Sequence, residues 1–219
     1  DYKIYLSDNT LIGSVGSSAS QYTHSPLSAN TQYIVYVRAV NSDGTGISSS
    51  NASTYTDANA PTSLSHDGAS QTTAAMKWTW VSGGAQSSYY ASSADPAANS
   101  GWTTNTYWDQ SGLSANAAIL VSAKAKNAAD EETSSTSITA YTSQNTPTGI
   151  SKSALATDSI TLAADGTFSN LTSGSSGLYF ANTTNSSNSG WLQTNSWQNS
   201  SLTANTQYTY TVKARNGDT

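Results

Sequence analysis

Two tryptophans are, by residue type, the side chains of this chain best suited to contact a ligand. Trp102 and Trp191 each follow a glycine, and an exposed indole ring can stack on the apolar face of a sugar ring. Large aromatic side chains are also the main apolar filling of a β-sandwich, and the chain has 6 Trp. Two alternatives therefore stay open: core packing for the tryptophans in general, and glycan stacking at this pair.

Residue types that support catalysis or metal binding are sparse. His24 and His66 are the only histidines and lie far apart, so neither a zinc site nor a Ser-His-Asp triad is expected. The run Asp130-Glu131-Glu132 could offer oxygens to calcium. Because Ca²⁺ takes about six or more oxygens from several positions, a solvated turn is favoured there. We expect no catalytic residue, no metal site and no cofactor, and we expect that the chain is not an enzyme.

Five Asn-x-Ser/Thr sequences could accept N-linked glycans if the source glycosylates exported proteins. In a chain so rich in Ser, Thr and Asn, several such sequences are expected by chance. The candidate acceptors are Asn51, Asn170, Asn182, Asn185 and Asn199.

Charge and composition narrow the range of partners. The chain has 8 Lys and Arg against 13 Asp and Glu, a net charge of −5, and phosphate binding needs clustered basic residues, so nucleic acid is not expected. No apolar run reaches membrane-spanning length, and we expect no membrane insertion in this segment. The polar, Lys-poor composition is similar to that of exported prokaryotic surface proteins, which implies an extracellular, cell-surface or secreted location. Because the sequence opens at Asp1 without Met, we expect a removed leader or an internal piece of a longer chain.

A seven-residue motif shows which elements must position these residues. Leu-Ser-Ala-Asn-Thr-Gln-Tyr at Leu27–Tyr33 returns as Leu-Thr-Ala-Asn-Thr-Gln-Tyr at Leu202–Tyr208, with a diverged copy at Leu113–Ile119. The offsets are 86 residues (27 to 113) and 89 residues (113 to 202). Self-similarity at a fixed period indicates one structural unit used repeatedly, and a repeated unit more often serves as spacer, scaffold or binding surface than as a catalytic site.

Hydrophobic alternation predicts that each unit is all-β. Apolar residues recur with a period of two at Ala74, Met76, Trp78 and Trp80, and again at Ile119, Val121, Ala123 and Ala125. Short strands with turn signals between them are typical of a two-sheet sandwich. We therefore divide the chain into unit 1 (residues 1–58, lacking the first two strands), unit 2 (residues 59–144, complete) and unit 3 (residues 145–219, lacking the last strand).

At these residues the chain resembles tandem fibronectin type III-like domains of the prokaryotic kind. Tyr33–Asn41 and Tyr208–Asn216 match the Tyr-x-Val-x-Ala-x-Asn sixth strand of that family, while Ala29 and Ala204 replace its usual Pro. The resemblance implies immunoglobulin-like β-sandwiches and a tyrosine corner, a ring whose hydroxyl bonds back to the backbone. Ile119 stands at that position in unit 2, so the corner should be missing there.

The resemblance and the repeats together favour a structural role. We expect a repeat segment of an extracellular filament, surface layer or large adhesin, acting as spacer or scaffold. Its partners would be neighbouring copies or flanking repeats of the same protein, with surface glycans as a further candidate. The alternative is an accessory spacer or carbohydrate-binding region of a secreted polysaccharide-degrading enzyme.

The incomplete end units permit two explanations. Either the natural chain continues at both ends, which we favour because the breaks fall within the motif, or a neighbouring molecule donates the missing strands. Strand donation would make this a self-polymerising subunit.

Overall fold

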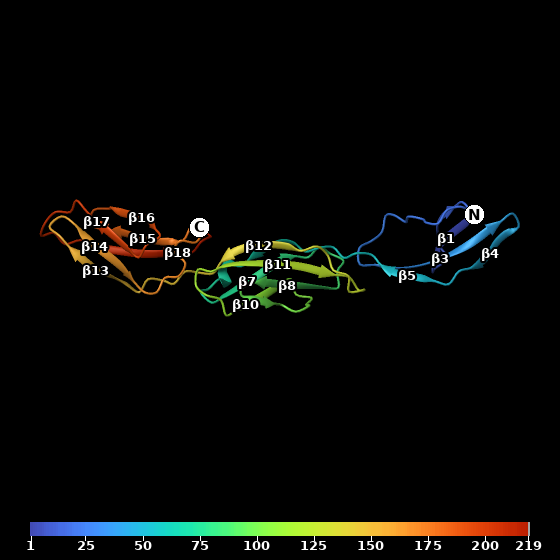
Figure 1. The fold of residues 1–219 in the computed structure, drawn as a ribbon, viewed down its shortest axis with the longest axis horizontal. Coiled ribbons are helices and arrows are strands. Elements are labelled where there is room, and N and C mark those ends of the chain that lie inside the picture. The colour runs from blue at the N-terminus through green and yellow to red at the C-terminus, as the bar shows by residue number, and fades with distance from the viewer. Residues whose placement is uncertain (219) are drawn as a thin grey trace.

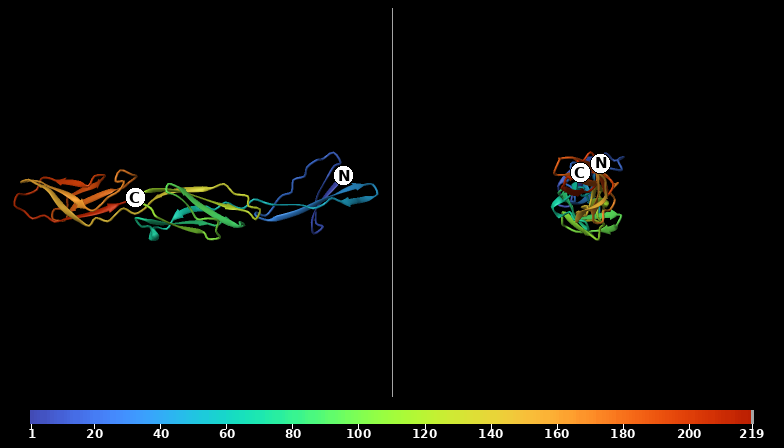
Figure 2. Two further views of the ribbon diagram at one scale, coloured as in Figure 1. Left: turned by 60° about the horizontal axis from the view of Figure 1, so that its bottom comes forward. Right: turned by 90° about the vertical axis from the view of Figure 1, so that its left-hand side faces the viewer.

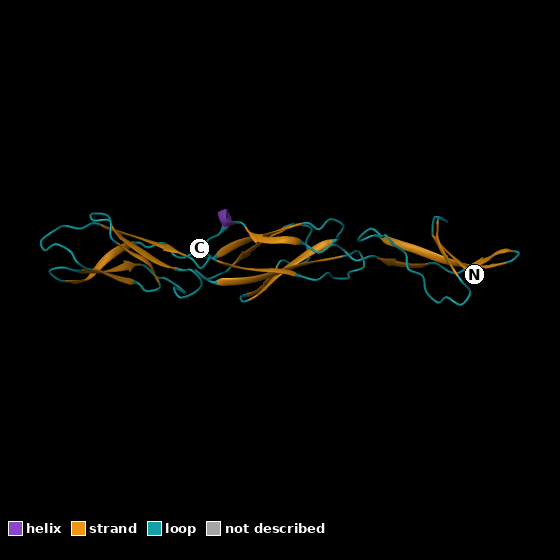
Figure 3. Cartoon of the chain, turned by 90° about the horizontal axis from the view of Figure 1, so that it is seen from above, coloured by secondary structure: helices purple, strands orange, loops and turns teal. Residues whose placement is uncertain are grey.

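The computed structural model describes residues 1–218 as a row of antiparallel β-sheets. Figure 1 shows three groups of strands in line along the long axis, and the end-on view in Figure 2 shows them lying behind one another. The single helical element of the described residues is a short 3-10 turn, η1 (Gly68–Ser70), visible as the purple segment in Figure 3. The all-β fold expected from the alternation is confirmed.

Unit 2 is a sandwich of two sheets, one of three strands and one of four, in the orders β10-β7-β6 and β12-β11-β8-β9. The first, second and fifth strands of the unit thus face the third, fourth, sixth and seventh, which is the arrangement of a fibronectin type III-like sandwich. The strands are β6 (Thr62–His66), β7 (Ala75–Val81), β8 (Ser88–Ala94), β9 (Ala97–Asn99), β10 (Tyr107–Ser111), β11 (Ala118–Lys126) and β12 (Thr136–Tyr141).

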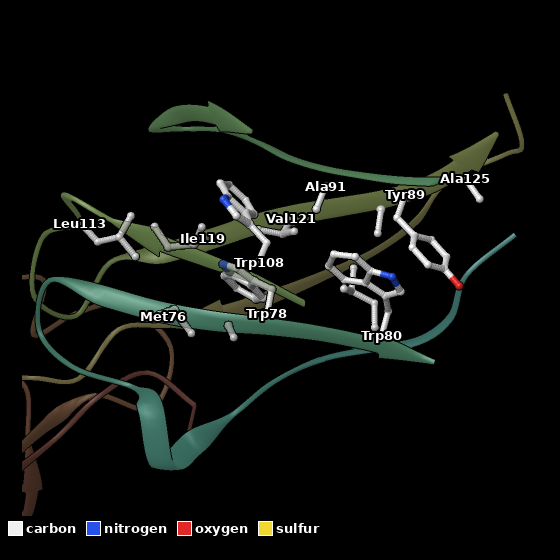
Figure 4. Packing of buried hydrophobic residues seen from close by; sticks show 13 residues of the cluster. Met76, Trp78, Trp80, Tyr89, Ala91, Trp108, Leu113, Ile119, Val121 and Ala125 are labelled. Carbon is white, nitrogen blue, oxygen red and sulfur yellow. The ribbon is translucent and has the colours of Figure 1, made fainter. Parts of the chain in front are cut away.

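The core of unit 2 follows from the period-two pattern (Figure 4). Met76, Trp78 and Trp80 point inward from β7 and are no more than 4% exposed. Small residues of β11 and β8 lie opposite, which leaves room for the indole rings. The Trp78 ring donates a 2.9 Å hydrogen bond to Gln110, and Gln110 in turn donates to the Ser93 hydroxyl. Trp78, Gln110 and Ser93 are therefore paired, whereas the Trp80 ring nitrogen and the Tyr89 hydroxyl are buried without a hydrogen-bond partner within residues 1–218.

Unit 3 repeats the plan with six strands in the orders β13-β14-β17 and β16-β15-β18. Where unit 2 has Trp78 paired with Trp108, unit 3 has Leu162 paired with Trp197. Where unit 2 has Ala91, unit 3 has Phe180. The large side chain is therefore on the second strand in unit 2 and on the third strand in unit 3, and both cores are filled. The strands are β13 (Gly149–Leu155), β14 (Ile160–Asp165), β15 (Gly177–Asn182), β16 (Asn188–Leu192), β17 (Ser196–Asn199) and β18 (Tyr210–Arg215).

Unit 1 forms one sheet only, in the order β2-β1-β3-β4, with β5 also pairing with β3. The sequence predicted that the first two strands are missing, and the structure has no fifth strand between β2 and β3 either. That strand pairs with the second strand in units 2 and 3, so without the second strand it has no ladder to join. The strands are β1 (Tyr2–Leu6), β2 (Leu11–Val15), β3 (Gln32–Asn41), β4 (Gly44–Ser48) and β5 (Ala52–Tyr55).

The tyrosine corners form where the sequence predicts them. The Tyr33 hydroxyl accepts a 3.0 Å bond from the Ser28 backbone nitrogen, and the Tyr208 hydroxyl accepts a 2.9 Å bond from that of Thr203. In unit 2, Ile119 fills the equivalent site as a 1% exposed core residue. The corner is therefore replaced there by apolar packing.

Candidate functional site: the junctions between units

The first junction, between units 1 and 2, is closed by hydrogen bonds on both sides of a short linker. The Asn127 side chain, at the end of β11, donates a 3.1 Å bond to the Thr56 carbonyl oxygen of unit 1. The Ala128 backbone nitrogen donates a 2.8 Å bond to the side-chain oxygen of Asn30. Linker residue Asn59 donates from its side chain to the Gly83 carbonyl oxygen at 2.8 Å. The linker is therefore bonded to the units on either side of it.

The second junction, between units 2 and 3, uses the equivalent residues. Asn216, the counterpart of Asn127, donates 3.2 Å bonds to the carbonyl oxygens of Tyr141 and Thr142. Asn116, the counterpart of Asn30, donates to the Ser169 and Asn170 carbonyl oxygens at 2.9 Å. The same asparagine at the end of the sixth strand thus reaches back to the preceding unit at both junctions.

A threonine connects each junction to the interior of the preceding unit. The Thr142 hydroxyl donates to the Ser114 carbonyl oxygen at 2.6 Å and accepts from the Ala117 backbone nitrogen at 2.9 Å. Thr56 makes the corresponding bonds in unit 1, to Ser28 and from Thr31. Because the carbonyl of the same threonine receives a bond from the next unit, the linker cannot shift without straining both units.

The repeated Ala-Asn motif explains the shape of this turn. Asn30, Asn116 and Asn205 have positive φ angles of 46°, 50° and 54°, a left-handed conformation that asparagine tolerates better than most residues. The backbone nitrogens of Asn30 and Asn116 donate to Asp57 and Ser143 just after the last strand. The motif that revealed the repeat is therefore part of each junction, which the sequence alone did not show.

The second junction carries an additional polar cluster around Asp218. Its carboxylate accepts from the Tyr141 backbone nitrogen at 3.0 and 3.1 Å, and His66 of unit 2 lies 3.9 Å away. Gln71 of unit 2 bonds to the Tyr141 carbonyl oxygen and lies 3.4 Å from Asp218. The only histidine of unit 2 thus faces a carboxylate of unit 3 rather than any catalytic partner.

The two Gly-Trp tryptophans lie beneath cationic side chains. Trp102 packs beside Tyr90 at 5.3 Å between ring centroids, and the Lys126 ammonium lies 4.6 Å from its centroid. Trp191 has the Arg215 guanidinium 4.3 Å above its ring. These are cation–π distances. With a cation already over each ring, glycan stacking at these residues stays a prediction.

The local backbone at these tryptophans is equivalent in the two units. In unit 2, Trp102 lies between β9, which ends at Asn99, and the bridge that pairs Tyr89 with Thr103. In unit 3 the Gly190-Trp191 pair lies within β16, where Leu178 pairs with Leu192 in the same way. Both glycines have positive φ angles, 64° and 63°, which favour a residue without a side chain.

The acidic run of unit 2 is occupied by its own hairpin. Asp130 pairs with Lys126 and Glu132 with Lys124, while Glu131 accepts a 2.9 Å bond from the Asn127 side chain. Within residues 1–218 no group of three or more His, Asp or Glu side chains is arranged to hold a metal ion. The three carboxylates therefore bind Lys124, Lys126 and Asn127 of the same hairpin.

The five glycan acceptor candidates lie in different environments. Asn182 and Asn199 are 1% and 4% exposed, and their amides donate to the Tyr210 hydroxyl. Asn170 donates to the Asn116 carbonyl oxygen at the second junction. Asn51, Asn170 and Asn185 are exposed. Burial of Asn182 and Asn199 disagrees with a glycan on the folded unit, because a glycan would occupy the amide nitrogen that bonds to Tyr210.

An open hollow lies on the inner face of the single sheet of unit 1. Ile4, Tyr22, Tyr33 and Val37 are among its lining residues, and its volume is about 430 Å³. In unit 2 the equivalent face of the sheet is covered by β7 with its tryptophans. The hollow is thus the space that a second sheet fills in a complete unit.

Among residues 1–218 no helix is long and apolar enough to span a membrane. Comparison with family models gives no match, and comparison with curated proteins gives none either.

Solved structures with a similar fold include arrays of fibronectin type III domains. A two-domain segment of chicken tenascin is 17% identical, with a TM-score of 0.47, over 73% of this chain and 93% of that one. A segment of chicken CNTN1 containing domains FN1 to FN3 is 17% identical, with a TM-score of 0.33, over 84% of this chain and 73% of that one. The fold assignment does not depend on these similarities. The strand order of units 2 and 3 shows by itself that they are tandem sandwiches of the fibronectin type III-like kind.

Proposed function

We propose that this chain is a spacer or scaffold segment of an extracellular filament, surface layer or large adhesin, in which the junctions hold successive units in line. The observation that carries the proposal is the recurrence of the same bond at both junctions, from Asn127 to Thr56 and from Asn216 to Thr142. A segment that only linked independent domains would have no need of equivalent contacts at equivalent positions.

The strength of such a junction follows from its chemistry. A net contribution of about 0.5–1.5 kcal/mol per hydrogen bond is typical, so a few bonds restrain a hinge without making it immobile. Interfaces between domains of one chain permit motion unless they are large and apolar. We therefore propose a chain that is extended on average and bends at the junctions under load.

The proposal is tested by measuring distances between spin labels on neighbouring units. Because the chain has no Cys, pairs of cysteines can be introduced at the exposed positions Ser18, Thr104 and Ser200. Asn127→Ala should broaden the distance distribution between units 1 and 2, and Asn216→Ala that between units 2 and 3.

The matched control is Asn41→Ala. Asn41 occupies the same place at the end of the sixth strand of unit 1, but its side chain only accepts a bond from Asp43 within its own hairpin. This control should leave both distributions unchanged. Unchanged distributions in both junction variants would contradict the proposal.

A further inference from the structure

We infer that Asn216 is a site of spontaneous chemical modification, deamidation through a succinimide, and that its conversion releases the second junction but not the first. The inference rests on the proposed role of the junctions. Asn216-Gly217 is the only Asn-Gly pair in the sequence. Glycine after asparagine leaves the attacking backbone nitrogen least hindered, because it has no side chain.

Both residues of this pair are required by the junction. A Cβ on Gly217 would lie 2.5 Å from ring atoms of Tyr141 in unit 2, so a larger residue cannot fit without displacing the ring. The backbone oxygen of Gly217 also accepts a 3.0 Å bond from Ser175. Asn216 supplies the amide hydrogens for Tyr141 and Thr142. The junction contacts therefore require both residues of Asn216-Gly217, the pair most prone to deamidation.

The reaction needs only water. The backbone nitrogen of Gly217 forms a bond to the side-chain carbonyl carbon of Asn216, the bond from that carbon to the amide nitrogen breaks, and ammonia leaves. Water then opens the five-membered ring at one of its two carbonyls and yields aspartate or isoaspartate at position 216. The sum is asparagine plus water giving the acid plus ammonia, with no redox change.

The product is incompatible with the contacts that Asn216 makes. A carboxylate has acceptor oxygens and no hydrogen to donate. It would face the carbonyl oxygens of Tyr141 and Thr142 and the carboxylate of Asp218, now 3.4 Å from the amide nitrogen. Two hydrogen bonds are lost and a like-charge contact is gained. The isoaspartate form also lengthens the backbone and shifts Gly217 from beneath the Tyr141 ring.

The first junction provides an internal comparison. Its equivalent residue, Asn127, also bonds to the preceding unit, but it precedes Ala128. The alanine side chain hinders attack by the backbone nitrogen. Ageing should therefore act on one of two similar junctions and leave the other intact.

The experiment ages the whole chain at mildly alkaline pH and maps peptides by mass spectrometry, with an isoaspartate-specific methyltransferase as a second detector. We expect position 216 to be the first asparagine converted, with the mass change of an amino group replaced by a hydroxyl, while Asn127 keeps its amide. The distance distribution between labels on units 2 and 3 should broaden to that of the Asn216→Asp variant, and the distribution between units 1 and 2 should stay the same.

Asn216→Gln is the matched control, because glutamine would have to close a larger ring and should not age on this timescale. Two results would overturn the inference: conversion at exposed pairs such as Asn185-Ser186 before any at Asn216, or full conversion at Asn216 with the distances unchanged. Failure of the proposed spacer role would be seen separately, as unchanged distances in Asn216→Ala before any ageing.

Discussion

At the scale of single residues, Thr142, which follows the last strand of unit 2, makes hydrogen bonds both within its own unit and to unit 3. Thr142 is fully buried, and its hydroxyl bonds to both Ser114 and Ala117. Thr142→Ala would remove both bonds, and a hydrogen bond between part-buried groups typically contributes about 0.5–1.5 kcal/mol. We expect the free energy of unfolding, measured with denaturant, to fall by about 2 kcal/mol in total.

Thr142→Ser keeps the hydroxyl and removes only a methyl group. It should therefore lose less than half as much stability as the alanine variant. Equal losses in the two variants would show that packing of the methyl group, and not the hydrogen bonds, is what the threonine contributes.

The exchange of bulk between Trp78 in unit 2 and Phe180 in unit 3 makes a second residue-scale prediction. Phe180 is fully buried among Leu162, Leu178 and their neighbours. Phe180→Ala should destabilise unit 3 by about 3–5 kcal/mol, because Ala164 opposite cannot fill the space. Near-ultraviolet circular dichroism during denaturation should show a separate early transition for that unit, whereas Phe180→Leu should shift it far less.

A third residue-scale prediction concerns pH. Hydrogen bonds from the Thr10 backbone and side chain hold the pKa of the exposed Asp8 carboxyl below its ordinary value. A lowered pKa in the folded state stabilises the turn above the unfolded-state pKa, and this contribution is lost as pH falls through the folded-state pKa. NMR titration should find the pKa of the Asp8 carboxyl lower in the folded chain than in the chain unfolded with denaturant.

At the scale of elements, the tyrosine corner can be tested directly. Tyr208→Phe removes the 2.9 Å bond to Thr203 and keeps the ring. We expect a loss of about 1 kcal/mol in the stability of unit 3. Tyr179→Phe is the control, because that ring packs beside Trp191 and its hydroxyl makes no bond within residues 1–218. A comparable loss in both variants would contradict a specific role for the corner.

Most strands could be predicted because their signals are local. Alternation within β7 and β11 and the Ala-Asn turn are properties of consecutive residues, and they predicted both strand and turn correctly. The contacts of the Gly-Trp tryptophans could not be predicted in this way. Lys126 and Arg215 lie far from Trp102 and Trp191 in sequence, and only the pairing of the strands brings these cations over the rings.

The junction contacts were beyond sequence analysis for a different reason. Asn127 and Thr56 are 71 positions apart, and nothing near either residue marks the other as its partner. Their common signal was recurrence: the sixth strands of units 1, 2 and 3 all end in asparagine, at Asn41, Asn127 and Asn216. Each of these side chains also accepts a bond from the turn that follows it, so recurrence at the strand end by itself did not separate a local role from a contact between units.

At the scale of the whole molecule, the row of units shown in Figure 1 depends on two small and similar junctions. They lie at opposite ends of unit 2 and share no residues. Changes at distant sites usually combine additively. A chain carrying both Asn127→Ala and Asn216→Ala should therefore show the sum of the two broadenings in the distance between labels at Ser18 and Ser200, and a larger effect would indicate that unit 2 transmits strain between its ends.

The chemistry of the junctions also sets how the molecule should respond to salt. The first junction is bridged by neutral amide and carbonyl groups, and none of the ion pairs within residues 1–218 crosses it. Salt screens charges but leaves neutral hydrogen bonds largely unaffected. The distance distribution between units 1 and 2 should thus be the same at low and high ionic strength. The second junction also includes the Asp218 carboxylate, which accepts from the Tyr141 backbone nitrogen, and it should respond more to salt. An equal response of the two junctions would show that unmatched surface charge, rather than the asparagine bonds, keeps the units in line.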